Sequence, residues 1–557
     1  MGIRQTGDLW WKNAVFYCLD VETYQDGDGD GIGDFKGLLR RLDHLEGLGV
    51  TCLWLMPFYP SPDRDDGYDI ADYYGVDPRL GTLGDFVDVM RAARERGMRV
   101  IADLVVNHTS VAHPWFQASR SDPESPYRDW YVWRDEVPKD GPDGIVFPDK
   151  EDSNWQWDEK AKQYYLHRFY KSQPDLDIAN PKVREEICRI VGFWLELGLS
   201  GFRVDAVPFL IETAGIDKPG DFAPHGWLRD LRAFINRRRG EAILMGEVNL
   251  MPEDVRRFFG DEDGDELHMC LNFNLNQAMA LSLARGDTGP LLHSLQTQPS
   301  IAPEDQWANF IRNHDEWSLD KLTEAEREEA FKAFGPKDSM QLFGRGLRRR
   351  LPTMLDGDQD RIRTAYALAF ALPGSPVLFY GEEIGMAENL DIPGRMSVRS
   401  PMQWLPGPSG GFSTAPPDKL HRPIVGGRKW GPSAVNVADQ LRDPGSLLTW
   451  MSGLLRVRRA TPELGFGKVS VLPVESGAVV ALAHDWEDRT LLTFHNLGEA
   501  PVTVEAKPPG AADWEGLITV LGEGEAKLAK DGTVTVELGR YGHRWLNAAR
   551  PGDVFRR

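Results

Sequence analysis

Short apolar runs rich in β-branched residues recur along the first two thirds of the chain. Runs of about four to eight such residues, bounded by turn residues, are typical of buried strands. Segments with helical spacing of apolar positions lie between many of them, for example at residues 85–95 and 183–197. Strands that alternate with helices predict βα units and a parallel sheet. The predicted strands are residues 14–21, 50–57, 98–107, 201–207, 242–248, 267–273, 309–313 and 376–380.

Eight strands in this arrangement predict an α/β fold with a closed (β/α)8 TIM barrel. The alternative is an open doubly wound sheet, which would place a glycine-rich phosphate turn directly after its first strand. Here the segment after the first strand is instead an Asp-rich loop, DGDGDGIGD at residues 26–34. The pattern therefore favours the closed barrel.

Two segments depart from the βα rhythm. Between the third and fourth predicted strands, residues 109–173 are rich in Trp, Tyr, Pro and Asp with weak periodicity, which is too long for a plain loop and predicts an inserted subdomain. After residue 466, short alternating runs such as AVVALAHD and TLLTFHNL predict a C-terminal antiparallel β-sandwich domain over residues 466–557. The catalytic barrel would then comprise residues 1–108 and 174–465.

Charge and composition narrow the classes of function. The 557 residues carry 64 Lys and Arg against 85 Asp and Glu, a net charge of −21, which argues against nucleic acid as a partner. No apolar run approaches the roughly 20 residues that span a bilayer, and no secretory signal precedes the first strand, so we expect no membrane partner. Four scattered cysteines without CxxC spacing favour a reducing, cytoplasmic location.

Polar side chains end several of the predicted strands, where a TIM barrel places its active site. Arg203 and Asp205 share one face of the fourth strand because they are two residues apart. Glu247 ends the fifth strand and Asp315 follows the seventh. Paired carboxylates, one nucleophilic and one with a raised pKa, are what retaining glycoside cleavage requires. The alternative is that each carboxylate forms an ordinary ion pair at a strand end.

The ordered motifs DLVVNH, GFRVDAV, GEVN and RNHDE, with GVTCLWLMPFYPSP upstream and GSPVLFYGEE downstream, resemble glycoside hydrolase family thirteen, the α-amylase superfamily. This resemblance implies that Asp205 is the nucleophile, Glu247 the general acid/base and Asp315 a third carboxylate that binds sugar hydroxyls. It further implies that Arg203 orients Asp205. The resemblance also implies that His108 and His314 donate hydrogen bonds to the reacting glucose.

The same resemblance predicts a pocket that accepts the end of a short sugar, in preference to an open cleft for polymer. Within DDGYDIADYYGVDP, Asp65 and Tyr68 match family positions that close around the terminal glucose. In VRSPMQW, Arg399 matches an arginine that reaches the terminal sugar hydroxyls in the exo-acting branch.

The Asp-rich loop resembles a structural calcium loop of the family's oligosaccharide-active branch. Oxygen ligands at alternate positions suit Ca²⁺, although Mg²⁺ could take its place. Gly37 occupies the position where an EF-hand carries Glu, so the loop is not an EF-hand, and a solvated acidic turn is the alternative interpretation. The predicted ligands are Asp26, Asp28, Asp30, the Ile32 carbonyl and Asp34.

Longer segments, including VNHTSVAHPWFQASR, LHRFYKSQPDLD and PSAVNVADQLRDPGSLLTWM, resemble the branch of the family that interconverts maltose and trehalose by transfer within a closed pocket. Small-molecule α-glucosides (maltose, trehalose and short maltooligosaccharides) are thus the expected partners. The sequence leaves open whether the protein forms a homo-oligomer. Two alternatives remain: an α-glucosidase or transglucosidase with another acceptor, and a sugar-binding protein without catalysis. The stretch NLDIPGRMS before VRSPMQW departs from the usual pattern of that branch, which leaves the acceptor open.

Overall fold

The computed structural model describes residues 7–138, 144–148, 150–212, 223–261 and 264–551. Its centre is a closed barrel of eight parallel strands in the order β1-β14-β10-β9-β8-β7-β3-β2. The predicted fold class is therefore confirmed. The barrel strands are β1 Phe16–Leu19, β2 Cys52–Leu55, β3 Arg99–Leu104, β7 Gly201–Val204, β8 Ile243–Gly246, β9 Met269–Leu271, β10 Gln306–Phe310 and β14 Ser375–Phe379.

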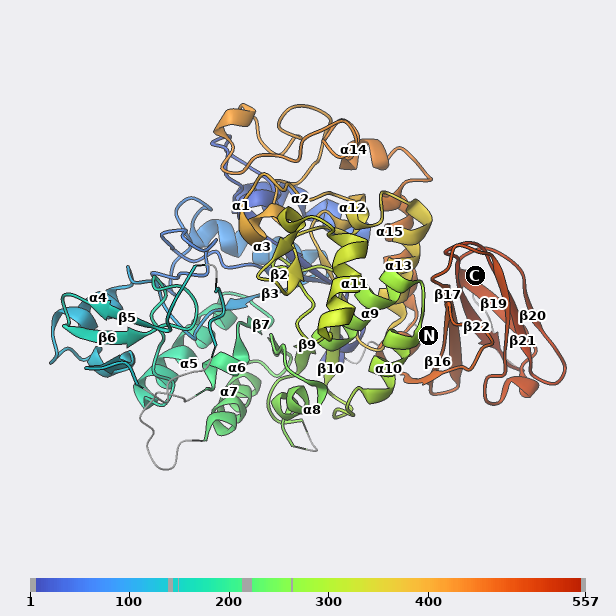
Figure 1. The fold of residues 1–557 in the computed structure, drawn as a ribbon, viewed down its shortest axis with the longest axis horizontal. Helices are drawn as coiled ribbons and strands as arrows, with labels where there is room; N and C mark the ends of the chain where they lie inside the picture. Colours follow the sequence, from blue (N-terminus) through green and yellow to red (C-terminus); the bar gives the residue numbers. More distant parts are fainter. Residues whose placement is uncertain (1–6, 139–143, 149, 213–222, 262–263, 552–557) are drawn as a thin grey trace.

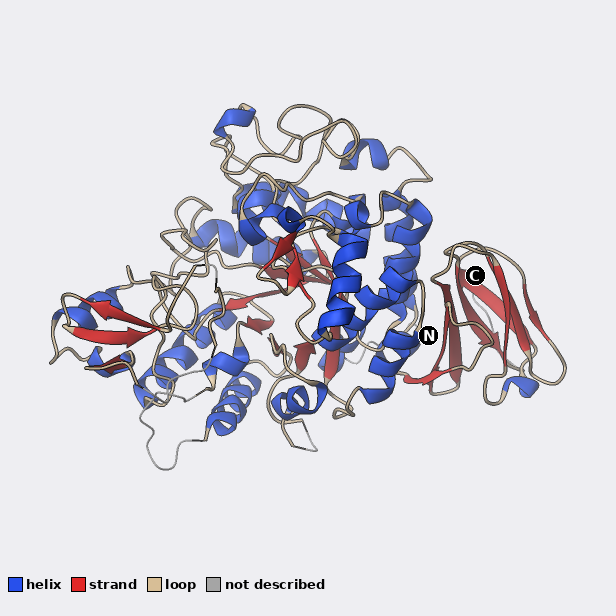
Figure 2. Ribbon diagram, in the orientation of Figure 1, coloured by secondary structure: helices blue, strands red, loops and turns tan. Residues whose placement is uncertain are grey.

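Amphipathic helices surround these strands (Figure 2). Their apolar faces close the core against the barrel, and their ends are capped; Thr82 and Asp85, for example, form a capping box at the start of α3. The main helices are α2 Phe35–Leu48, α3 Leu83–Glu95, α5 Pro181–Glu196, α7 Pro224–Arg238, α9 Phe273–Arg285, α10 Gly289–Thr297, α11 Glu324–Phe334, α13 Gln359–Ala371 and α15 Leu447–Ala460.

The seventh barrel strand differs from its prediction. The sequence pattern predicts residues 309–313, whereas β10 covers Gln306–Phe310 and the chain leaves the barrel after it. All five residues of β10 are buried, so the strand lacks the alternation of apolar and polar positions that would fix its ends. The consequence is functional, because Asn313 to Asp315 lie in the loop above the barrel and not within a strand.

A separate small sheet lies between β3 and β7 in sequence, at one end of the molecule (Figure 1). Its strand order is β4-β6-β5, and an isolated bridge between His108 and Asp175 joins the beginning of this insertion to its end. The elements are α4 Pro114–Ser121, β4 Trp133–Arg134, β5 Trp155–Asp158 and β6 Gln163–Leu166.

The C-terminal part of the chain forms two antiparallel sheets at the opposite end (Figure 1). One sheet has the order β15-β16-β17-β22-β19 and packs against the barrel helices through Leu482, Leu491 and Trp545. The strands of both sheets are β15 Lys468–Val471, β16 Val479–Trp486, β17 Arg489–Asn496, β18 Val502–Ala506, β19 Gly516–Leu521, β20 Ala526–Leu528, β21 Val534–Leu538 and β22 His543–Ala549.

Two further observations bear on the sequence predictions. All four cysteines are free, which agrees with the absence of a disulfide framework. Among the described residues, no helix combines the length and apolar character that a membrane crossing needs.

Candidate active site

A cavity of about 430 Å³ opens at the carboxyl ends of the barrel strands. Asp205, Glu247 and Asp315 all line it, together with Asp65, Tyr68 and His108. The structure therefore brings together three carboxylates that the sequence separates widely. A volume in this range suits a small ligand such as a disaccharide.

Arg203 contacts the carboxylates of both Asp205 and Glu247. Its side chain is fully buried, and Nη1 donates to Oδ1 of Asp205 at 2.5 Å, while Nη2 forms an ion pair with Oε2 of Glu247 at 2.8 Å. Asp103, a further acidic residue at the end of β3, accepts from the same Nη1 at 2.5 Å and from Trp54 Nε1 at 2.6 Å. One guanidinium thus compensates three acidic groups, of which Asp103 and Asp205 are buried.

The turn after β7 directs both reacting groups. Ala206 adopts φ 48° and ψ 42°, a left-handed conformation that a non-glycine residue rarely takes. This turn points the backbone N–H of Ala206 at Oε2 of Glu247, to which it donates at 3.0 Å. Gly246 precedes Glu247 because a Cβ atom there would lie 2.3 Å from a methyl carbon of Leu267.

Burial and neighbouring charges give Glu247 a higher pKa than Asp205. Burial raises the pKa of Glu247 to about 7, with Arg203 opposing the shift and the Asp205 charge adding to it. Burial raises the pKa of Asp205 to about 6, against the attraction of Arg203. At neutral pH a proton therefore resides on Glu247 more often than on Asp205, which is the asymmetry that an acid and a nucleophile need.

Asp315 is held in the ionised form. Burial alone would raise its pKa, but His314, Arg395 and Arg399 together keep the pKa of Asp315 well below its usual range. Oδ1 accepts from Arg395 at 2.7 Å and from Arg399 at 3.0 Å, and Oδ2 lies 3.1 Å from Nε2 of His314. Because burial lowers the pKa of His314 to about 4, the two arginines supply the positive charge at neutral pH.

Tyr68 and the two histidines form an ordered wall. Tyr68 and His314 stack with ring centroids 5.5 Å apart, and their Oη and Nε2 atoms are 2.7 Å apart. His108 Nε2 is 3.0 Å from the Tyr68 carbonyl oxygen, and burial lowers the pKa of His108 to about 4. His108 is thus neutral at neutral pH and faces the cavity, whereas His314 lies behind its surface.

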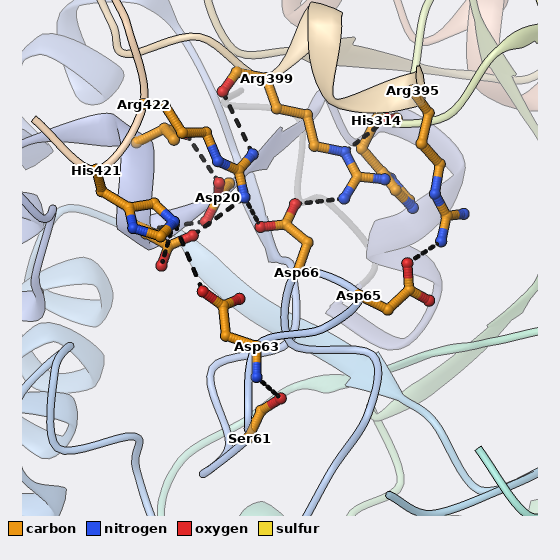
Figure 3. Close-up of polar contacts among 12 residues, drawn as sticks. Asp20, Ser61, Asp63, Asp65, Asp66, His314, Arg395, Arg399, His421 and Arg422 are labelled. Carbon is orange, nitrogen blue, oxygen red and sulfur yellow. Dashed lines mark hydrogen bonds and ion pairs between the residues drawn. The ribbon is translucent and has the colours of Figure 1, made fainter. Parts of the chain in front are cut away.

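The motif VRSPMQW indicates Arg399 as the arginine that reaches the sugar, but Arg395 and not Arg399 lines the cavity. Arg399 is fully buried behind the cavity and donates to Asp66, Asp315 and the His314 carbonyl oxygen. Arg395 lines the cavity and donates to Asp65 at 2.5 Å (Figure 3). It also donates to Asp315. Arg395 belongs to none of the family motifs. It lies in the stretch NLDIPGRMS, which departs from the usual family pattern.

Phe147 and Arg345, which the sequence did not reveal, also line the cavity. Phe147, in the segment between β4 and β5, packs on Phe343 with ring centroids 5.3 Å apart and on Tyr170 at 4.5 Å. Phe343 lies between the short strands β12 Gln341–Leu342 and β13 Gly346–Leu347. Beside it, Arg345 donates to the Val146 carbonyl oxygen at 3.1 Å. These contacts connect the insertion to the opposite wall of the cavity.

The Asp-rich loop gathers part of its predicted ligand set. Carboxylate oxygens of Asp26, Asp28 and Asp34 lie within 4.8 Å of one another. Asp30 points elsewhere in the loop, where its Oδ1 accepts from the Ile32 N–H at 2.8 Å. Hard carboxylate oxygens are the donors that Ca²⁺ and Mg²⁺ prefer, so the cluster fits a divalent cation.

The barrel and the converging carboxylates are the features of a retaining enzyme that acts on glycosidic bonds. Residues 21–335 and 338–467 match the alpha amylase catalytic domain, and residues 489–547 match a sucrose hydrolase-like C-terminal domain. The chain belongs to the α-amylase family, glycoside hydrolase family thirteen, as its motifs predict.

Similar proteins span nearly the whole chain. A trehalose synthase of Pimelobacter sp. (strain R48) is 42% identical over 509 residues, which are 89% of this chain and 88% of that protein. The trehalose synthase/amylase TreS of Mycobacterium tuberculosis is 41% identical over 96% of this chain and 89% of its own length. A trehalulose synthase mutant solved in complex with Tris superposes with a TM-score of 0.77 at 26% identity, covering 97% of this chain and all of that one.

Proposed function

We propose that this protein interconverts maltose and trehalose by retaining transglucosylation, through a β-glucosyl ester on Asp205. The observation that carries the proposal is the single guanidinium of Arg203, which holds both Asp205 and Glu247 at one side of a disaccharide-sized cavity. The proposed retaining route requires the two carboxyl groups to be about 5–5.5 Å apart, whereas an inverting enzyme keeps them about 6.5–9.5 Å apart to admit a water.

The first step cleaves the donor. Glu247 gives its proton to the glycosidic oxygen while an oxygen of Asp205 attacks the anomeric carbon, so the C–O bond breaks as the ester bond forms. Asp315 stays ionised and stabilises the positive charge that develops on the sugar ring. The released glucose leaves Glu247 ionised, and the Ala206 N–H stabilises that carboxylate.

The second step returns the glucosyl group to an acceptor. Glu247 removes the proton from an acceptor hydroxyl, whose oxygen attacks the anomeric carbon and displaces Asp205. If the released glucose reorients and attacks through its own anomeric hydroxyl, the product is trehalose. Two inversions leave the donor carbon in its α configuration.

Closure of the cavity supports transfer over hydrolysis. Arg395 lines the cavity and bridges Asp65 and Asp315, and this bridge would stop a sugar chain from passing through. Phe147 also lines the cavity, and it packs on Phe343. Water that is kept away from the glucosyl ester cannot hydrolyse it while glucose turns over.

Hydrolysis of short α-glucosides is the second candidate. The side chains of Glu247 and Asp315 keep 22% and 18% of their surface exposed, so solvent reaches the reacting groups when no sugar is bound. The same two steps with water as the acceptor would make the protein an α-glucosidase.

Isotopes distinguish the two routes in one experiment. Maltose is incubated with the protein in H₂¹⁸O with added ¹³C-glucose, and products are followed by NMR and mass spectrometry. Intramolecular transfer yields trehalose with neither label, whereas transfer to external glucose yields ¹³C-trehalose. Glucose carrying ¹⁸O as the main product would replace the first proposal by the second, and no turnover of any α-glucoside would overturn both.

The Asp-rich loop forms a second part of the proposal. Asp26, Asp28 and Asp34 would hold Ca²⁺, with Mg²⁺ as a substitute, and the ion would neutralise three clustered carboxylates. Burial, together with the charges of Asp28 and Asp26, raises the pKa of Asp34, which indicates a repulsion that a cation would relieve. Asp34 also caps α2, so the ion would fix the loop that leads from β1 to α2. Its role would be structural.

A cytoplasmic location completes the proposal. The four free cysteines support it, because free thiols persist in a reducing compartment.

A further inference from the structure

A row of alternating charges runs from Arg399 through Asp66 to Arg422, which lies in an irregular segment of the chain (Figure 3). Arg399 connects this row to Asp315. Arg399 donates to Asp315 through Nη2 and to Oδ2 of Asp66 through Nη1. The other oxygen of Asp66, Oδ1, accepts from Nη2 of Arg422. Asp66 therefore lies between two guanidinium groups, only one of which also reaches the third carboxylate of the site.

All members of this row are buried. Arg399 is 0% exposed, Asp66 7% and Arg422 8%. Although burial by itself would raise the pKa of Asp66, Arg422 and Arg399 hold it well below its usual range. Removing one partner from a buried ion pair is costly because the other charge stays buried without compensation.

Arg422 also compensates the acidic residues after β1. Its Nη2 lies 3.2 Å from Oε2 of Glu22. Burial raises the pKa of Asp20 to about 6, with the Asp66 charge adding to the shift and Arg422 opposing it. The titratable and charged groups around Arg422 are Asp20, Glu22, Asp63, Asp66, Arg79, Arg399 and His421.

We propose that Arg422 is a positioning residue for Asp315: by compensating Asp66 and Glu22, it leaves Nη2 of Arg399 directed at Asp315. The inference rests on the proposed function in that Asp315 stabilises the charged sugar ring. Without Arg422, Asp66 keeps Arg399 as its only guanidinium partner among the residues that the structure describes, and it draws the positive charge of Arg399 away from Asp315. The effect falls on the transition state, where Asp315 faces a developing positive charge.

Three variants test this role: Arg422→Met, Arg422→Lys and the control Arg428→Met. Arg428 lies in the same irregular segment and is exposed, so its variant removes the same charge without touching the row. Kinetics are measured with p-nitrophenyl α-glucoside, and folding is followed by circular dichroism. Arg422→Met should lower kcat by about 10-fold or more with KM changed less than about threefold, and Arg428→Met should change neither.

A rescue variant separates positioning from a general structural role. Adding Asp20→Asn to Arg422→Met removes one buried negative charge while keeping a helix cap, and should restore part of the lost kcat. No recovery of kcat in this double variant would overturn the proposal.

Two further readouts keep the test decisive. If Arg422→Met does not fold, Arg422→Lys replaces it, since an ammonium group cannot reproduce the planar guanidinium contacts; unchanged kcat in folded Arg422→Lys would then overturn the proposal. Binding of the cationic sugar mimic 1-deoxynojirimycin, measured by calorimetry, does not depend on turnover. Weakening of about fivefold or more in Arg422→Met, with wild-type binding in Arg428→Met, supports the role even if no α-glucoside is turned over, an outcome that rejects only the proposed function.

Discussion

Nη2 of Arg203 lies 2.8 Å from Oε2 of Glu247, so the group that must donate a proton is in contact with a fixed positive charge. An adjacent cation favours the ionised carboxylate, yet burial and the Asp205 charge outweigh it and raise the pKa of Glu247 to about 7. The geometry thereby keeps an acid that is protonated part of the time at neutral pH and can lose its proton readily in the first step.

This balance predicts a narrow, bell-shaped dependence of kcat/KM on pH. Activity should fall below about pH 6 as Asp205 becomes protonated and above about pH 7 as Glu247 becomes ionised. Because the two groups interact, the limbs report values for the pair. Initial rates with maltose between pH 4 and 9 check this prediction. A rate that stays constant across that range would contradict the assigned roles.

Azide distinguishes the two carboxylates chemically. Asp205→Ala should reduce turnover by about 10⁴-fold or more while the barrel stays folded, because no ester can form. With α-glucosyl fluoride and azide, this variant should yield β-glucosyl azide by a single inversion, whereas Glu247→Ala should yield the α anomer through the intact ester. NMR of the products gives the anomeric configuration. The same anomer from both variants would reject the assignment.

The contacts over the cavity predict a change in product ratio. Phe343→Ala or Arg345→Met should raise the ratio of released glucose to trehalose by about threefold or more, since water gains access to the ester. Lys337→Met, at an exposed position near the same loop, is the matched control. Product analysis after brief incubation with maltose measures the ratio. An unchanged ratio in both cavity variants would show that these contacts do not restrict water.

Divalent cations should stabilise the fold without taking part in the reaction. Adding Ca²⁺ to protein dialysed against a chelator should raise Tm by several degrees, through preferential binding to the folded state. Asp28→Ala should abolish that gain, while kcat measured well below Tm stays within about twofold. Differential scanning calorimetry provides the measurement. The same Ca²⁺ gain in Asp28→Ala would place the binding site elsewhere.

The barrel was predictable because each buried strand consists of a short apolar run, which can be recognised in the sequence. The family motifs also indicated Asp205, Glu247 and Asp315, and the structure gathers them at one cavity. Strand ends were less predictable, as β10 illustrates, because a fully buried parallel strand carries no alternation.

Charge compensation between residues far apart in the sequence could not be predicted. Arg395 pairs with Asp65, 330 positions away, and with Asp315, 80 positions away. Asp66 pairs with Arg422 across 356 positions. No local pattern encodes such pairs.

The sequence by itself thus determined the fold class, the family and the kinds of side chain at the strand ends, because these depend on hydrophobic periodicity and on short motifs. Only the tertiary structure decided which arginines line the cavity and how burial and neighbouring charges shift the pKa values of Asp205 and Glu247. The physical reason is that burial and charge act over a few ångströms in space, and the folded chain alone sets those distances.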